Sequence, residues 1–259
     1  MQVNQVSARQ GVIWISEGIR LVMQSFGPLS MLTLAYLFAL MLLTLIPIIG
    51  PAAPLIVVQV LSVGFMEAVR SAERGLPPSL STLFAGFHRY GPTVRNRLLG
   101  LGLVNAAATL LSLAAAALVD DGSLIKLATG SIEASELQAL DQQLLWASLI
   151  FAALYMPSQM ALWFAPIFTA WHRLGIAQSL FYSFFTVWQN RAAFLAFMLG
   201  WFALAFIASL VVQAVKWLAP DTPLILSIVL TPLSLILMAS LYSSYWPSYR
   251  DSVSPSEAC

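Results

Sequence analysis

Charged residues are scarce in this sequence. Only 9% of its 259 residues are Asp, Glu, Lys or Arg, whereas 59% are hydrophobic. Soluble domains carry about 25% charged residues, so this composition excludes a water-soluble globular protein, and we expect no nucleic-acid partner. The single cysteine, Cys259, excludes an intramolecular disulfide and is expected to be a free thiol. Residues 1–27 lack the apolar core and cleavage site of a signal peptide, so we expect no removable signal.

The motifs of known catalytic and cofactor chemistry are also missing. There is no Ser-His-Asp constellation, glycine-rich phosphate loop or nucleotide motif. His88 and His172 have no Cys, Asp or Glu at metal-ligand spacing, so we predict neither a metal nor a cofactor. Glu67, near the cytoplasmic end of the second predicted span, is the only candidate for a functional ionisable residue in the membrane. We expect it to pair with Arg70 or Arg74, at i+3 and i+7 on a helix.

Long uncharged tracts take the place of these motifs. A helix of about 20 residues crosses a hydrocarbon core of roughly 30 Å and satisfies its own backbone polar groups in lipid. The first tract has room for two crossings, separated at Pro47-Ile48-Ile49-Gly50-Pro51, where two prolines flank a glycine and disfavour a continuous helix. We predict an all-α fold, a polytopic membrane helix bundle in one integral membrane domain over residues 1–259. Its six predicted spans are residues 29–47, 54–70, 98–119, 144–171, 192–215 and 224–245.

The basic residues are divided unequally between the two sides of these spans. All ten arginines fall on the side of the N-terminus, and only Lys126 and Lys216 fall on the other. Because cytoplasmic loops are enriched in Lys and Arg, this bias predicts a bacterial inner-membrane protein with both termini in the cytoplasm. The acidic loop, residues 120–141, is then outside. The polar tail Arg250–Cys259 is expected to be disordered.

Three segments share one amphipathic pattern that ends on an aromatic residue. The spacing is i, i+3, i+4 and i+7, which places the residues on one helical face. The matching sets are Ile19, Val22, Met23 and Phe26; Leu83, Gly86, Phe87 and Tyr90; and Phe181, Phe184, Phe185 and Trp188.

A pair of spans follows each copy of the pattern. We therefore predict three repeated helix-hairpin units, near residues 11–70, 79–171 and 175–247, each beginning with a short amphipathic helix in the cytoplasmic headgroup layer. Leu83, Phe87 and Tyr90 are predicted to face the lipid or the bundle. The alternative is that the spacing reflects only the amphipathic helices themselves, which all show it.

Two sets of residues are candidates for binding. Pro157 frees backbone carbonyls within the fourth span, and Ser158 and Gln159 lie beside it among Met and aromatic residues. This stretch predicts either a polar-lined hollow for a lipid chain or apolar ligand, or a packing kink satisfied by a neighbouring helix. Asn105, in a span rich in small residues, is expected to hydrogen-bond a neighbour.

The second set is a basic rim of five arginines. Each basic residue near an anionic leaflet contributes about 1 kcal/mol of attraction, so these side chains are predicted to contact lipid headgroups. The same rim is expected of any inner-membrane protein that follows the charge rule. Its members are Arg70, Arg74, Arg89, Arg95 and Arg97.

Several motifs together resemble a family of uncharacterised six-span inner-membrane proteins of proteobacteria. The most specific are LFAGF at 83–87, WFAPIFTAWH at 163–172 and the pair Asn190-Arg191. This resemblance implies an envelope protein without established activity, and it supplies no functional residues. The units of surface helix and hairpin are more distantly similar to the non-catalytic membrane domain of glycerophosphodiester phosphodiesterases, whose catalytic barrel has no counterpart here.

These observations predict an integral inner-membrane protein without catalytic activity. Its role would be to contact membrane lipids or to support the assembly of a membrane complex, with another membrane protein or a second copy of itself as partner. The alternative is a transporter or channel for a small neutral or apolar solute that uses the hollow from Pro157 to Gln159. An intramembrane enzyme ranks third, because it needs two titratable groups at one depth, for instance Glu67 with His172.

Overall fold

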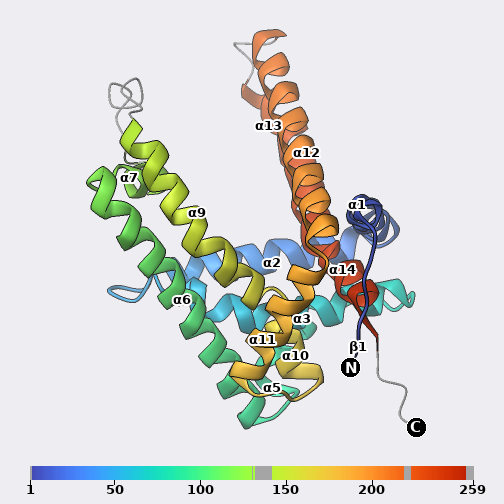
Figure 1. Cartoon of the computed structure of the whole chain (residues 1–259). Helices are drawn as coiled ribbons and strands as arrows, with labels where there is room; N and C mark the ends of the chain where they lie inside the picture. The colour runs from blue at the N-terminus through green and yellow to red at the C-terminus, as the bar shows by residue number, and fades with distance from the viewer. Residues whose placement is uncertain (1, 130, 132–141, 219–222, 255–259) are drawn as a thin grey trace.

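The computed structural model describes residues 2–129, 131, 142–218 and 223–254, and these residues are almost entirely helical (Figure 1). The all-α class is therefore confirmed, apart from one pair of two-residue strands. In chain order the elements are β1 Gln2–Val3, α1 Ala8–Gln24, α2 Phe26–Thr44, α3 Ala53–Glu73, α4 Leu80–Leu83, α5 Ala85–His88, α6 Pro92–Asp120, α7 Ser123–Thr129, α9 Gln142–Leu162, α10 Ala165–Trp171, α11 Ile176–Gln189, α12 Arg191–Leu218, α13 Pro223–Ser243, α14 Tyr245–Ser252 and β2 Val253–Ser254.

Among the described residues, five helical segments are long and apolar enough to cross a membrane. They are Phe26–Thr44, Ala53–Glu73, Pro92–Asp120, Gln142–Trp171 and Arg191–Trp217, and each overlaps a predicted span. The break predicted at the Pro47–Pro51 motif is present between α2 and α3. The sixth predicted span coincides with α13, an uncharged helix of 21 residues. Six membrane crossings stay a prediction.

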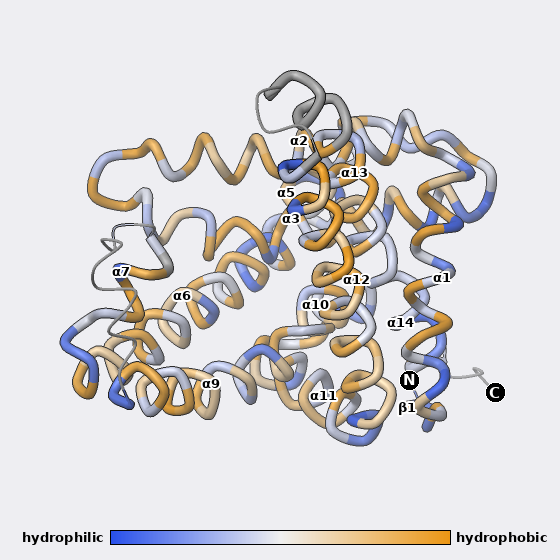
Figure 2. Tube along the Cα trace, turned by 90° about the horizontal axis from the view of Figure 1, so that it is seen from above, coloured by the Kyte–Doolittle hydropathy of each residue, from blue (hydrophilic) through white to orange (hydrophobic). Residues whose placement is uncertain are grey.

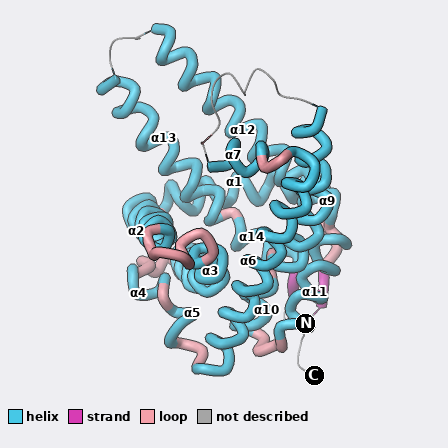
Figure 3. The backbone as a smooth tube through the Cα atoms, turned by 90° about the vertical axis from the view of Figure 1, so that its left-hand side faces the viewer, coloured by secondary structure: helices cyan, strands magenta, loops and turns pink. Residues whose placement is uncertain are grey.

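The membrane-spanning helices expose much of their apolar surface. Figure 2 shows hydrophobic residues along α2, α9 and α12, and Phe202 and Trp217 on α12 are 80% and 82% exposed. Apolar surface on this scale marks contact with a membrane or another protein, which agrees with the apolar spans. Figures 1 and 3 show that the pairs α2–α3, α6–α9 and α12–α13 point in different directions from a common base. We use "base" for α1, α4, α5, α10, α11, α14, the strand pair, the last two turns of α3 (residues 67–73) and the loop between α5 and α6.

Each predicted amphipathic segment packs on the helical pair of a different unit. Helix α1 packs on α12 and α13, α4 and α5 pack on α3, and α11 packs on α9 and α10. On α1 the anchor is Trp14, which is fully buried with its ring 5.3 Å from that of Phe194. The middle segment is not one helix, because α4 and α5 are separated at Phe84. Leu83 is buried, and Phe87 and Tyr90 pack against the core, so of the two predicted surroundings, lipid or bundle, these residues face the bundle.

The two ends of the chain meet at the base. Strands β1 and β2 pair antiparallel, with Val3 opposite Val253, and the Asn4 side chain donates hydrogen bonds to the Asp251 carbonyl and to Ser254 Oγ. The prediction of a disordered tail from Arg250 onward is therefore wrong for Arg250–Ser254, since long-range partners order this segment. Residues 255–259 and 132–141 lie outside the part of the chain that the structure describes.

Arg250 connects three helices of the base. Its guanidinium pairs with Glu17 of α1 at 2.8 Å, Glu73 of α3 at 2.6 Å and Asp251 of α14 at 2.9 Å. Partial burial by itself lowers the pKa of Arg250, but the hydrogen bonds and charges of Asp251, Glu17 and Glu73 together raise it above its ordinary value. The side chain thus stays charged, and it fixes α1 and α14 against α3.

Close packing of α1 on α12 gives a first prediction. A methyl group added at Gly11 would overlap the Ala193 carbonyl oxygen and approach the Phe197 backbone nitrogen, whereas one added at Gly27 meets nothing within 4 Å. Overpacking of this kind costs about 1–3 kcal/mol. Gly11→Ala should therefore lower the unfolding temperature in detergent by several degrees, and Gly27→Ala should not. Equal melting temperatures for the two variants would contradict this packing.

Candidate functional site

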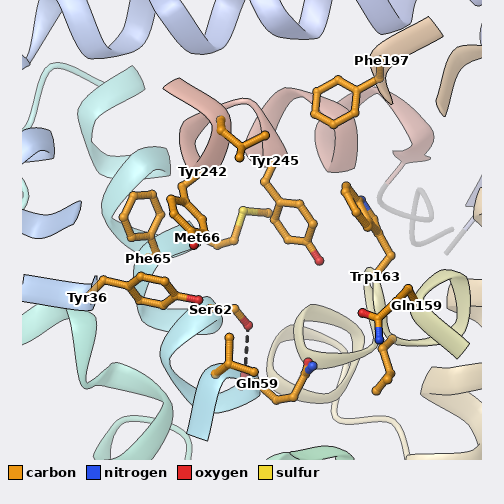
Figure 4. A pocket seen from close by; sticks show the side chains of 13 residues that line it. Tyr36, Gln59, Ser62, Phe65, Met66, Gln159, Trp163, Phe197, Tyr242 and Tyr245 are labelled. Carbon is orange, nitrogen blue, oxygen red and sulfur yellow. Dashed lines mark hydrogen bonds between the residues drawn. The ribbon is translucent and has the colours of Figure 1, made fainter. Parts of the chain in front are cut away.

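A cavity of about 320 Å³ lies where the three helical pairs converge (Figure 4). Helices α3, α9 and α13, the second member of each pair, all contribute to its wall, together with α2, α12 and α14. Most of the wall is aromatic or aliphatic, and the amides of Gln59 and Gln159 are its main polar groups. A largely apolar cavity with a few polar groups is typical of a site for a small apolar or amphipathic ligand. We call it the central cavity.

Two of the four residues predicted for an intramembrane polar or kink site, Gln159 and Asn105, meet beside this cavity. Gln159 Nε2 donates a hydrogen bond of 3.2 Å to Asn105 Oδ1, and Asn105 Nδ2 donates one of 2.9 Å to the Leu55 carbonyl. Asn105 is buried, so it joins α6 to α3 and to α9 as a satisfied polar group. Gln159 keeps part of its amide at the cavity wall. Asn105 therefore hydrogen-bonds neighbouring helices, as expected, and of the three residues predicted to form the hollow only Gln159 lies at the cavity wall.

Pro157 and Ser158 do not line the central cavity. Pro157 is exposed, and Ser158 Oγ donates a 2.7 Å hydrogen bond to the Tyr155 carbonyl of its own helix. Helix α9 continues through Pro157 to Leu162, and the chain leaves the helix only at Trp163 and Phe164. The break comes just before Pro166, because that proline lies in the first turn of α10, where it is readily accommodated. The cavity therefore begins beyond the predicted proline.

An apolar groove of about 500 Å³ adjoins the central cavity. It lies along α12 and α13 and shares Trp163, Phe197 and Leu241 with the cavity wall. The indole N–H groups of Trp163 and Trp201 are buried in this region, and neither has a hydrogen-bond partner among the described residues. Buried unpaired donors are uncommon and call for an acceptor. Sequence patterns do not predict this groove, because it depends on how α12 and α13 pack against Trp163.

A third hollow, the basic pocket, lies at the base and measures about 270 Å³. Tyr249 on its wall and Tyr245 on the wall of the central cavity are separated by one turn of α14. Both tyrosines pack on Phe164, each with a ring separation of 5.7 Å. The basic pocket is lined by Arg70, Trp171, His172, Trp246, Tyr249, Arg250 and Val253.

Glu67 does not pair with Arg70 or Arg74, so that prediction is wrong. Its carboxylate accepts hydrogen bonds from the Tyr90 hydroxyl, from Trp171 Nε1 at 3.0 Å and from Arg89 at 3.4 Å. The loop between α5 and α6 brings Arg89 and Tyr90 over α3, which local spacing on one helix does not reveal. Burial, and then the hydrogen bond and charge of Glu67, raise the pKa of Tyr90 above its usual range.

The other predicted rim arginines differ in their surroundings. Arg74 and Arg95 are exposed. Arg97 donates hydrogen bonds of 2.8 Å and 3.3 Å to the carbonyls of Arg173 and Leu174, so it ties α6 to the loop before α11. The rim is thus not a uniform charged surface, and Arg97 has a structural role. Arg70 stands apart, because it lies in the basic pocket.

The two histidines differ in exposure and in partners. His88 is exposed, whereas His172 Nε2 lies 2.8 Å from the Tyr249 hydroxyl at the basic pocket. No described hydrogen bond joins His172 to Glu67, the example given above of two titratable groups at one depth; each contacts a different tyrosine. Within the part of the chain that the structure describes, no group of three or more His, Cys, Asp or Glu side chains could hold a metal ion.

Burial lowers the pKa of His172 and gives a second prediction. Between this lowered value and the unfolded-state value of about 6.5, the unfolded chain binds more protons, so stability falls as pH falls. Unfolding measured in detergent from pH 7 to pH 5 should therefore show a shallower loss of stability for His172→Gln than for the wild type. His88→Gln is the matched control and should follow the wild type. If stability changed with pH by the same amount in all three proteins, the lowered pKa of His172 would be contradicted.

Comparison with known proteins supplies the family. A protein of Burkholderia thailandensis, named as a probable inner membrane protein, is 39% identical to this chain over 256 residues, which cover 96% of this chain and 93% of that protein. No protein-family model matches the chain, and no solved structure does. The more distant resemblance to the membrane domain of glycerophosphodiester phosphodiesterases stays a prediction. Identity of this extent over nearly the whole length, together with the apolar helices, shows that the chain belongs to the family of this probable inner membrane protein and is an integral inner-membrane protein.

Proposed function

We propose that the protein is a non-catalytic lipid-binding protein of the inner membrane, with the central cavity and the adjoining groove as its binding site. The observation that carries this proposal is the pair of buried, unpaired indole donors, Trp163 and Trp201, in an otherwise apolar groove. An acyl chain would lie along the groove, and an ester carbonyl or hydroxyl at its head would accept hydrogen bonds from these indoles once their rings turn the buried N–H groups toward it. Gln59 and Gln159 offer further polar contacts at the cavity end.

The same proposal includes six membrane crossings in three units. An even number of crossings places both termini on one side, in agreement with the paired strands β1 and β2. The pattern of contacts supports the three units, since the amphipathic segment of each unit packs on the helical pair of another unit. The central cavity is lined by the second helix of every pair. Exposed apolar faces, such as that of α12, leave room for another membrane protein or a second copy of the chain.

A transporter or channel for a small neutral or apolar solute is the second candidate. The observation in its favour is that two hollows lie on either side of an aromatic layer. Tyr245 borders the central cavity and Tyr249 borders the basic pocket, with Phe164 packed against both. Transport would require this layer to open. No described residue of the central-cavity wall is charged, so an ion is a poor fit as substrate.

The lipid proposal predicts a loss of bound lipid when the two indole donors are removed. The double variant Trp163→Phe and Trp201→Phe keeps aromatic bulk but removes both N–H groups. Each lost hydrogen bond is worth about 1 kcal/mol, so the loss of two should weaken the apparent lipid affinity measured by native mass spectrometry about thirtyfold. Trp217→Phe is the matched control, because Trp217 is 82% exposed and does not line the groove.

Unchanged lipid retention in the double variant would contradict the proposal. Solute flux into proteoliposomes distinguishes the second candidate. If Gln159→Leu abolished flux of a neutral solute while lipid retention stayed at the wild-type level, the transporter would be the better description.

The proposed orientation gives a separate prediction. With Cys259→Ser as background, single cysteines at Ser123 and at His88 should react with a membrane-impermeant maleimide from opposite sides of oriented vesicles. His88→Cys should be labelled only from the cytoplasmic side, because the ten arginines lie on its side of the spans. Labelling of both positions from the same side would exclude this topology.

A further inference from the structure

Arg70 is a cation without a carboxylate partner. Its natural partners on α3 are Glu67 and Glu73, three residues away on either side. Glu67 binds Arg89 instead, and Glu73 binds Arg250. Among the described residues, no hydrogen bond or ion pair reaches the Arg70 guanidinium. In the folded base, the carboxylates of Glu67 and Glu73 are thus paired with other arginines. The Arg70 guanidinium lines the basic pocket without a carboxylate partner.

Two tryptophans hold the guanidinium in place. The Arg70 Cζ atom lies 5.1 Å from the centre of the Trp171 ring and 5.8 Å from that of Trp246. Both indoles are anchored through their N–H groups, Trp171 to Glu67 and Trp246 to Glu73. Contact with aromatic faces stabilises the cation but leaves its N–H donors without acceptors. A planar guanidinium held in this way is preorganised to bind an oxyanion through two parallel hydrogen bonds.

The charges around the pocket favour an anion. The charged side chains on its wall are Arg70 and Arg250, and no carboxylate is among the lining residues. Behind the wall, four carboxylates are paired with the guanidiniums of Arg89 and Arg250, so none of them neutralises Arg70. A phosphodiester carries one negative charge and offers the oxygens that Arg70 lacks. The four carboxylates belong to Glu17, Glu67, Glu73 and Asp251.

We propose that the basic pocket binds the phosphodiester of a phospholipid headgroup through the Arg70 guanidinium. This inference rests on the proposed function in one respect, namely that the base lies in the headgroup layer. The proposal assigns a specific headgroup contact to Arg70 and not to Arg74 or Arg95. Those two arginines are exposed and line neither the central cavity, the apolar groove nor the basic pocket. Small soluble phosphodiesters share the same chemistry, so the test compares both sources.

The test measures ligand binding to the full-length protein by native mass spectrometry in an uncharged detergent. The probes are phosphatidylglycerol, dimethyl phosphate and inorganic phosphate, each titrated against wild type, Arg70→Gln and the matched control Arg95→Gln. We expect Arg70→Gln to weaken phosphatidylglycerol binding about tenfold and Arg95→Gln to change it less than twofold. Equal losses in the two variants would overturn the proposal, because the rim would then act as diffuse charge. Dimethyl phosphate or inorganic phosphate binding as tightly as the lipid would overturn the headgroup assignment.

Two further variants test the proposal if Arg70→Gln folds poorly. Arg70→Lys keeps the charge but lacks the planar group between the indoles. Its affinity for phosphatidylglycerol should therefore fall between those of wild type and Arg70→Gln. Wild-type affinity in a folded Arg70→Lys protein would overturn the role of the planar group. The double variant Trp163→Phe and Trp201→Phe should keep the Arg70-dependent preference for phosphatidylglycerol. Loss of lipid in that variant alone supports only the groove, and loss in Arg70→Gln alone supports only the basic pocket.

Discussion

A junction around Arg250 and Asp251 holds the base together, and the rest of the structure depends on it. Arg250 pairs with Glu17 on α1 and Glu73 on α3, and Asp251 accepts hydrogen bonds from Gln10 at 2.7 Å and Trp14 at 3.0 Å. These contacts fix α1, which in turn packs on α12 and α13. The last helical pair is thus attached to the first by side chains of the base. Apolar surfaces in lipid have no hydrophobic drive to associate, so a specific polar junction is an effective way to set the arrangement of pairs that diverge.

The same junction determines which cation remains available for binding. Glu73 could have paired with Arg70 along α3, but it is engaged by Arg250 and by Trp246 Nε1 at 2.7 Å. Glu67 is likewise engaged by residues that follow α5. Structural stability and the free charge of Arg70 therefore have one cause, because the carboxylates that hold the helices of the base together are the ones that would have neutralised it.

Sequence patterns predicted the parts of this fold that depend on neighbouring residues. The uncharged tracts located the apolar helices, the Pro47–Pro51 motif located a break, and Asn105 hydrogen-bonds its neighbours as expected. Contacts between distant segments were missed. The ordered tail at Arg250 depends on residues near the N-terminus, and Glu67 turns to Arg89 across the fold. The cavity wall begins after Pro157, because α9 tolerates that proline and ends only at Leu162. Helical spacing contains none of this information.

The central cavity and the basic pocket are separate sites in this conformation. Met66 and Arg70 lie one turn apart on α3, and so do Tyr245 and Tyr249 on α14, with the first of each pair at the cavity and the second at the pocket. A ligand that filled both would have to pass Phe164, whose ring centre is 5.7 Å from each tyrosine, the spacing of aromatic rings in direct contact. A chain bound in the groove and a headgroup bound at Arg70 therefore belong to different molecules unless the aromatic layer opens. Opening of that layer is the one motion that would turn two lipid sites into a path across the base.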